Sequence, residues 1–207
     1  MRYWLTAFSL ALALTPAAAE KADRTKPLNY EADSGECDDL KQICVLVGNV
    51  LLSKGTMRAA GERVQVRKDA EGYQYGVITA APGKLATFRQ RRDASKPGMQ
   101  EFVEGHAERI EYDEREDTVR LTTRARVRLL ENETQRDELR GDAITYDQRN
   151  SKYFVTGGKP SADPNNRDGR VHGTIAPRVQ TDAPTPASKP APVSLTPAKD
   201  IANPRRE

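Results

Sequence analysis

The chain has 207 residues, with 33 Lys and Arg against 30 Asp and Glu, two histidines and two cysteines. Residues 20–159, which lie between two segments of different composition, hold 25 basic and 25 acidic side chains. This neutral balance argues against a duplex nucleic-acid binder, which needs a clustered excess of Lys and Arg to neutralise phosphates.

The first 19 residues have the pattern of a secretory signal peptide. Arg2 supplies a positive charge, residues 3–14 are uncharged and largely apolar, and Ala17, Ala18 and Ala19 provide a small-residue cleavage site. The alternatives are a membrane anchor and a buried helix, but the run is shorter than the roughly 20 residues that span a bilayer. We therefore predict export with cleavage after Ala19, and no later segment has transmembrane length.

Cys37 and Cys44 are the only cysteines, and they lie seven residues apart. In an exported chain such a pair favours a disulfide over a metal site, which usually needs four ligands. The alternative is two reduced, buried thiols, because a bridge across a hairpin requires the two side chains to face each other.

Between these landmarks and residue 158 the hydrophobic period is two. In residues 118–121 and 124–129, arginines or threonines alternate with apolar residues, which places the two kinds on opposite faces of a strand. The same alternation occurs around Tyr30, Val64 and Ile110, and short polar turns separate the segments. Many short strands with no helical period predict an antiparallel, all-β sandwich, barrel or jellyroll.

A weak internal repeat accompanies the strands. The hexapeptides that begin at Gly61, Ala107 and Gly141 all follow the pattern small, acidic, any, aliphatic, any, apolar. Their irregular spacing does not fit a solenoid, and we interpret the small residue as a bend where a strand passes from one sheet to another. The alternative is chance recurrence in a chain rich in Glu and Arg.

From residue 160 onward the chain contains nine of its thirteen prolines and few large apolar side chains. Such a segment buries too little apolar surface to offset the entropy of ordering. We therefore predict three parts: a signal peptide (1–19), a β domain (20–158) and a Pro-rich disordered tail (159–207).

Several segments, taken in order, resemble the LptA family of the OstA-like fold, and the resemblance covers about residues 24–157. These segments are residues 26–33, the Gly48-Asn49-Val50 tripeptide, residues 83–90, residues 103–107 and residues 141–146.

The resemblance implies an antiparallel, open-ended β-jellyroll in the periplasm, with neither catalytic activity nor a cofactor. It implies an apolar groove that shields the lipid A acyl chains of lipopolysaccharide while the lipid passes from the inner to the outer membrane. The implied partners are lipopolysaccharide, an LptC-like inner-membrane export complex, an LptD-like outer-membrane translocon, and further copies of the chain stacked head to tail.

The apolar parity of the strands gives a candidate groove lining, although ordinary core packing explains any one of these residues equally well. The candidates are Leu28, Tyr30, Leu46, Val50, Leu52, Val64, Val66, Phe88, Ile110, Tyr112, Val119, Leu121, Val127, Leu129, Ile144 and Tyr146.

Three features depart from the family pattern. Cys37 and Cys44 stand where aliphatic residues are usual, so a bridge there would pin the first hairpin. Residues 123–125 (Thr-Arg-Ala) replace an expected Gly-Asn turn, which makes the bend there uncertain. The Pro-rich tail replaces or extends the last edge strand.

Catalytic and metal-binding patterns are weak. Neither His106 nor His172 has ligand spacing, and the acids of residues 113–117 fit a solvated hairpin tip better than an acid–base pair. Two alternatives to lipid carriage remain: a non-conducting structural or adaptor module of an envelope complex, and a hydrolase whose groups meet only in the fold.

Overall fold

A computed structural model of the chain describes residues 22–93, 98–160 and 168–177. The predicted signal peptide and residues 161–167 and 178–207 of the predicted tail lie outside this part. Within it, no helix is long and apolar enough to cross a membrane. All strand pairs are antiparallel, which confirms the predicted all-β class.

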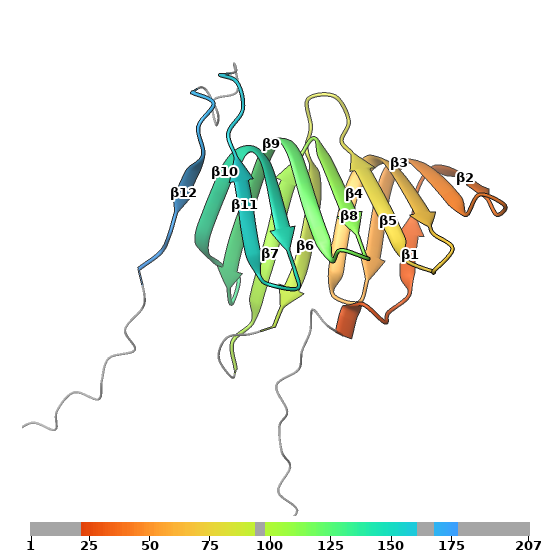
Figure 1. The fold of residues 1–207 in the computed structure, drawn as a ribbon, viewed down its shortest axis with the longest axis horizontal. Coiled ribbons are helices and arrows are strands. Elements are labelled where there is room, and N and C mark those ends of the chain that lie inside the picture. The colour runs from red at the N-terminus through yellow and green to blue at the C-terminus, as the bar shows by residue number, and fades with distance from the viewer. Residues whose placement is uncertain (1–21, 94–97, 161–167, 178–207) are drawn as a thin grey trace, which may run out of the picture. The chain divides into compact units, whose positions relative to one another are not determined.

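Twelve strands follow one another along the described residues (Figure 1). They are β1 (Leu28–Glu31), β2 (Ser34–Asp38), β3 (Ile43–Lys54), β4 (Met57–Lys68), β5 (Gln74–Thr79), β6 (Ala86–Arg92), β7 (Glu101–Ala107), β8 (Arg109–Asp113), β9 (Thr118–Glu131), β10 (Thr134–Asp147), β11 (Lys152–Thr156) and β12 (His172–Thr174).

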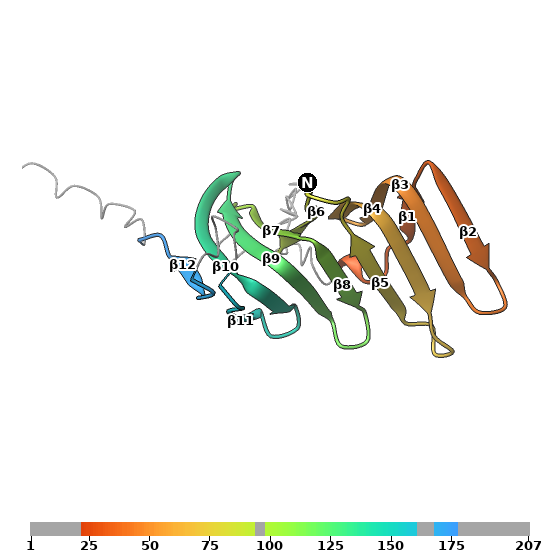
Figure 2. The ribbon, with the colours of Figure 1, turned by 90° about the horizontal axis from the view of Figure 1, so that it is seen from above.

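The sheet folds into two layers because four long strands, β3, β4, β9 and β10, belong to both. The first layer has the order β1-β3-β4-β6-β7-β9-β10-β12. The second layer has the order β2-β3-β4-β5-β8-β9-β10-β11. Figure 2 shows β5 and β8 on one side of the long strands and β6 and β7 on the other. This arrangement is the predicted jellyroll.

The long strands bend where they pass from one layer to the other. The β3–β4 register shifts between Val47 and Val50, and the β9–β10 register shifts between Gly141 and Ala143. At Gly61, β4 exchanges its partner β6 for β5, and a Cβ there would lie 2.5 Å from the Cγ2 atom of Ile78. The interpretation of the repeat as a series of bends is thus confirmed, since each small residue lies where layers change.

The bend in β9 forms although its sequence lacks the expected Gly-Asn turn. Thr123 and Arg124 both take positive φ angles, 63° and 57°, the region that the Gly48-Asn49 pair occupies in β3 with 83° and 47°. A β-branched residue with positive φ is strained. The fold therefore imposes the bend on β9 against the local preference of its residues.

The sheet extends past the predicted domain boundary at residue 158. Residues 168–177 are described, and three of them form β12, which pairs with Glu138, Leu139 and Arg140 of β10. The backbone N–H of Ala176 also donates to the Asp137 Oδ1 atom at 2.9 Å. Backbone pairing needs no apolar side chain, so the composition of this segment did not reveal it.

Candidate functional site

The space between the two layers is apolar across the width of the sheet. In the second layer one row of register partners crosses seven strands: Leu46, Val64, Ile78, Ile110, Leu121, Ile144 and Val155. In the first layer the corresponding row is Leu52, Ala59, Phe88, Gly105, Val127 and Leu139. Register partners share a face, so each row is a continuous apolar track perpendicular to the strands.

Most of the predicted groove lining lies in this interior. Eleven of the sixteen candidates are buried: Leu46, Val50, Leu52, Val64, Phe88, Ile110, Val119, Leu121, Val127, Ile144 and Tyr146. Leu28, Val66, Tyr112 and Leu129 pack against them half-buried. Tyr30 differs: its side chain is 49% exposed, because β1 is an edge strand and only Leu52 stands opposite it.

Seven further buried residues of the interior were not predicted from the sequence. They are Met57, Ala59, Ile78, Ala86, Val103, Ala107 and Ala125. Four are alanines, whose small side chains give a weak alternation signal. Ile78 follows Val77, and two adjacent apolar residues leave the inward parity undecided. The usable signals were the alternations Met57-Arg58-Ala59 and Ala86-Thr87-Phe88.

Around Phe88 and Tyr112 the described side chains leave little space between the layers. A cavity of about 30 Å³ lies there, lined by residues that include Leu52, Phe88, Ile110 and Tyr112. Such a space holds only a water molecule or two. Burial raises the pKa of the Tyr112 phenol far above its usual range, so this group stays protonated and uncharged.

A seam of polar side chains, buried except for the half-buried Glu114, lies at the ends of β3, β8 and β10. The Lys54 ammonium at the end of β3 pairs with the Glu114 carboxylate, in the turn between β8 and β9. The second oxygen of that carboxylate accepts the backbone N–H of Gln74 at 2.7 Å. Lys54 belongs to the first layer and Glu114 to the second, so this ion pair joins the two.

The segment before β1 completes this seam, at the lower end of Figure 1. The buried Asp23 carboxylate accepts from the Thr56 N–H at 2.7 Å and from the Gln90 Nε2 atom at 3.2 Å. Gln90 in turn accepts from the Gln148 Nε2 atom at 2.7 Å, across the layers. We call Asp23, Lys54, Gln90, Glu114 and Gln148 the polar seam.

The predicted solvated tip at residues 113–117 is wrong for two of its acids. The residues do form the turn between β8 and β9, but Glu114 belongs to the polar seam and the Asp117 side chain is buried. Asp117 pairs with Arg24, from the segment before β1. Partners distant in sequence bury these carboxylates, which a charge run does not reveal.

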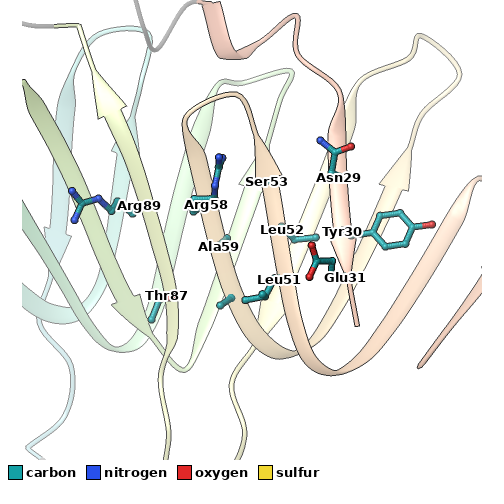
Figure 3. Close-up of a pocket in the computed structure, with 11 residues that line it drawn as sticks. Asn29, Tyr30, Glu31, Leu51, Leu52, Ser53, Arg58, Ala59, Thr87 and Arg89 are labelled. Carbon is teal, nitrogen blue, oxygen red and sulfur yellow. The ribbon is translucent and has the colours of Figure 1, made fainter. Parts of the chain in front are cut away.

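Outside the first layer a depression of about 280 Å³ lies beside β1 (Figure 3). Its lining includes Glu31, Leu51, Arg58 and Arg89, and Leu51 is 52% exposed. An exposed leucine between charged groups at a sheet edge is suited to receive an apolar side chain of another protein segment.

The two ends of the sheet expose unpaired strand edges. In the described part of the chain, β1 and β2 pair only with β3, and β11 and β12 pair only with β10. The structure joins Cys37 to Cys44, which are register partners on β2 and β3. An open edge can accept another strand.

Comparison with known proteins finds one matching family model and several similar chains. The family is described as "LptA/(LptD N-terminal domain) LPS transport protein" and matches residues 29–152. The lipopolysaccharide export system protein LptA of Escherichia coli K12 is 33% identical over 140 residues, which cover 68% of this chain and 70% of that protein. LptH of Pseudomonas aeruginosa is 29% identical over 149 residues, which cover 72% and 78%.

A solved structure agrees with the fold. The crystal structure of LptH from Pseudomonas aeruginosa, described as the LptA-homologous periplasmic component of the lipopolysaccharide transport device, superposes with a TM-score of 0.60. The match has 22% identity and covers 75% of this chain and 99% of that one. At this identity the likeness supports the jellyroll alone.

Proposed function

This chain belongs to the family of LptA/(LptD N-terminal domain) LPS transport proteins, and from that premise we propose that it is a periplasmic carrier of lipopolysaccharide. It shields the lipid A acyl chains between its two layers and contributes no catalysis or cofactor of its own. The observation that carries the proposal is the pair of apolar rows that cross the sheet from one edge region to the other.

The apolar rows suit acyl chains for an energetic reason. Each methylene transferred from water into such an interior gains roughly 0.8 kcal/mol. The rows contain no charged side chain, and most of the side chains packed around them are apolar. Lipid uptake would replace contacts between the layers with contacts to the acyl chain, so the hydrophobic free energy is retained.

Because little space lies around Phe88 and Tyr112, loading there would require the layers to separate at the polar seam. Lys54 and Glu114 would then separate and each would be hydrated by water, which makes opening reversible. A buried ion pair gains little net stability, since desolvation offsets the attraction. A bound acyl chain can therefore break the contacts of the polar seam.

The open edges support head-to-tail stacking of copies. Strands β11 and β12 of one copy would pair with β1 and β2 of the next, which aligns the apolar rows of successive copies. Exposed apolar side chains lie at both ends, Tyr30 and Leu51 at one, Phe154 and Val171 at the other. The terminal copies would meet an LptC-like inner-membrane export complex and an LptD-like outer-membrane translocon. Export through a signal peptide cleaved after Ala19 would deliver the chain there.

Photo-crosslinking in cells tests the lipid path. A photoreactive residue at Phe88 or Tyr112, whose side chains line the remaining cavity, should yield an adduct with lipopolysaccharide. The matched controls are Thr87 and Glu111, the preceding residues on the same strands, which face away from the interior. Adducts from the controls alone, or from no position, would refute the groove.

The close packing around Phe88 and Tyr112 also favours a second candidate, a structural or adaptor module that recruits an envelope complex through its edges without carrying lipid. In that case the edge contacts form in cells while Phe88 and Tyr112 give no lipid adduct. The same crosslinking experiment therefore separates the two functions.

A further inference from the structure

A row of basic side chains crosses the outward face of the first layer. His106 of β7 is the register partner of Arg126 of β9, which is opposite Arg140 of β10, which is opposite His172 of β12. Register partners share a face, so the four side chains form one line over four neighbouring strands. We call these four residues the basic row.

Arg126 lacks an acidic partner among the described residues. No hydrogen bond or ion pair reaches it there, and its Nε atom is buried without an acceptor. Arg128, the next outward residue of β9, and Arg140 both bind the buried Glu138 carboxylate, Arg128 through its Nε atom at 3.0 Å. His172, at the end of the row, binds Asp168.

The nearest other carboxylates are already engaged. Glu104, beside His106 on β7, pairs with the Arg89 guanidinium. The same guanidinium binds Glu133 with two hydrogen bonds of 2.6 and 2.7 Å. Neither acid is therefore free to compensate Arg126.

The electrostatics of the row reflect the unpaired charge of Arg126. Burial, and next the charges of Arg128 and Arg140, lower the pKa of the Arg126 guanidinium, although Glu138 and Glu104 act in the opposite direction. Burial, and next the charge of Arg126, lower the pKa of the His106 imidazole, whose Nδ1 atom is buried without a partner. A partly buried cation whose N–H donor has no acceptor is unfavourable unless a bound anion neutralises its charge and accepts the hydrogen bond.

We propose that the basic row is a binding site for a phosphate group, with Arg126 as its principal contact. A phosphate carries about −1.5 to −2 charges near neutral pH, so it would compensate the unpaired Arg126 guanidinium. Its oxygens also accept paired N–H donors from a guanidinium fork. A small rotation of the Arg126 side chain would bring its buried Nε–H to the ligand.

The site is independent of the apolar interior, because its side chains face away from the groove. The ligand therefore reaches it from solvent and not from between the layers. Two sources supply the same chemistry, free phosphate and the phosphorylated sugar of a lipid headgroup. Only the second depends on the proposed carrier function.

Nuclear magnetic resonance on the processed full-length chain tests the site. At constant ionic strength, inorganic phosphate should shift the His106 ring and Arg126 Nε–H resonances in a saturable manner. Arg126→Gln should weaken binding about tenfold or more, because it removes a charge-assisted contact. Arg126→Lys keeps the positive charge but loses the paired N–H donors of the guanidinium group. Its affinity for phosphate should therefore lie between that of Arg126→Gln and that of the wild type.

The matched control is Arg120→Gln, on the same strand but in the second layer, where the Arg120 side chain is exposed and outside the basic row. It should bind phosphate like the wild type.

The proposal is wrong if the wild type shows no saturable shift, or if Arg126→Gln and Arg126→Lys both bind phosphate as the wild type does. A second titration with glucosamine 1-phosphate separates the sources: tighter binding assigns a lipid headgroup, and equal binding assigns free phosphate.

Discussion

The two ends of the sheet have the same plan but different reinforcement. At each end one long strand carries two short edge strands, β1 and β2 on β3, and β11 and β12 on β10. At the first end a disulfide joins β2 to β3, and the segment before β1 is anchored through Asp23. At the second end the pairing of β12 covers only three residues.

This difference suggests a division of roles between the ends. An edge strand that is already fixed loses little conformational entropy when another strand pairs with it. A weakly held edge strand can instead adapt its conformation to the strand that it pairs with. In a head-to-tail stack the β1–β2 end would then act as the rigid acceptor and the β11–β12 end as the adaptable one. Three experiments test this contrast between the two ends.

The largest expected effect comes from proline at each edge. Asn29→Pro on β1 and Phe154→Pro on β11 each fix φ and remove an N–H donor, so each should weaken self-association about a hundredfold. Light scattering of either variant alone should report monomers, while circular dichroism shows the folded sheet.

Mixing the two variants provides the control. Asn29→Pro keeps its β11–β12 end and Phe154→Pro keeps its β1–β2 end, so an equimolar mixture should form a one-to-one complex and nothing longer. If either variant alone still forms dimers, like ends associate and the contrast between acceptor and adaptable end is lost.

The disulfide should make a smaller contribution, confined to the β1–β2 end. Replacing both Cys37 and Cys44 by serine should lower the free energy of unfolding by about 2 kcal/mol, because a closed short loop restricts the unfolded chain. Denaturant unfolding measures this change, and the wild type under reducing conditions should match the variant. Hydrogen exchange should accelerate in β2 but not in β11; equal acceleration at both ends would mean that the bridge stabilises the whole sheet.

The sequence revealed the regular features of this architecture and missed those that depend on distant partners. Alternation identified the strands and most interior positions, because a half-buried strand enforces a period of two. It did not identify β12, whose His-Gly-Thr sequence pairs through its backbone alone. The bend at Thr123 was doubtful because tertiary structure, not local preference, imposes positive φ there.

The candidate site follows the same division. Apolar lining residues such as Phe88 and Ile110 were predictable from parity, whereas the polar seam was not. Glu114 looked like a solvated acid because its neighbours in sequence are charged, and only the fold brings Lys54 to it. Tyr30 was placed in the lining by parity, but an edge strand leaves it half exposed.

The smallest expected effect is a response to acid that arises separately at each end. Hydrogen bonds from His172 lower the pKa of the Asp168 carboxylate near β12, and hydrogen bonds from Lys41 lower the pKa of the Asp38 carboxylate at the end of β2. A depressed carboxyl pKa stabilises the fold above the unfolded value, and this contribution disappears as pH falls through the folded pKa. Both ends should therefore lose protection from hydrogen exchange below about pH 4.

Because each carboxylate lies at one end only, substitution can separate the two responses. Protection factors in β12 and in β2 should each fall by less than about fivefold between pH 5.5 and 3, as expected of exposed pairs. Asp168→Asn should abolish the change at β12 and leave the change at β2 as it is in the wild type. If Asp168→Asn removed the fall at both ends, the response would be global, and the weaker end would then owe its adaptability to the short pairing of β12 alone.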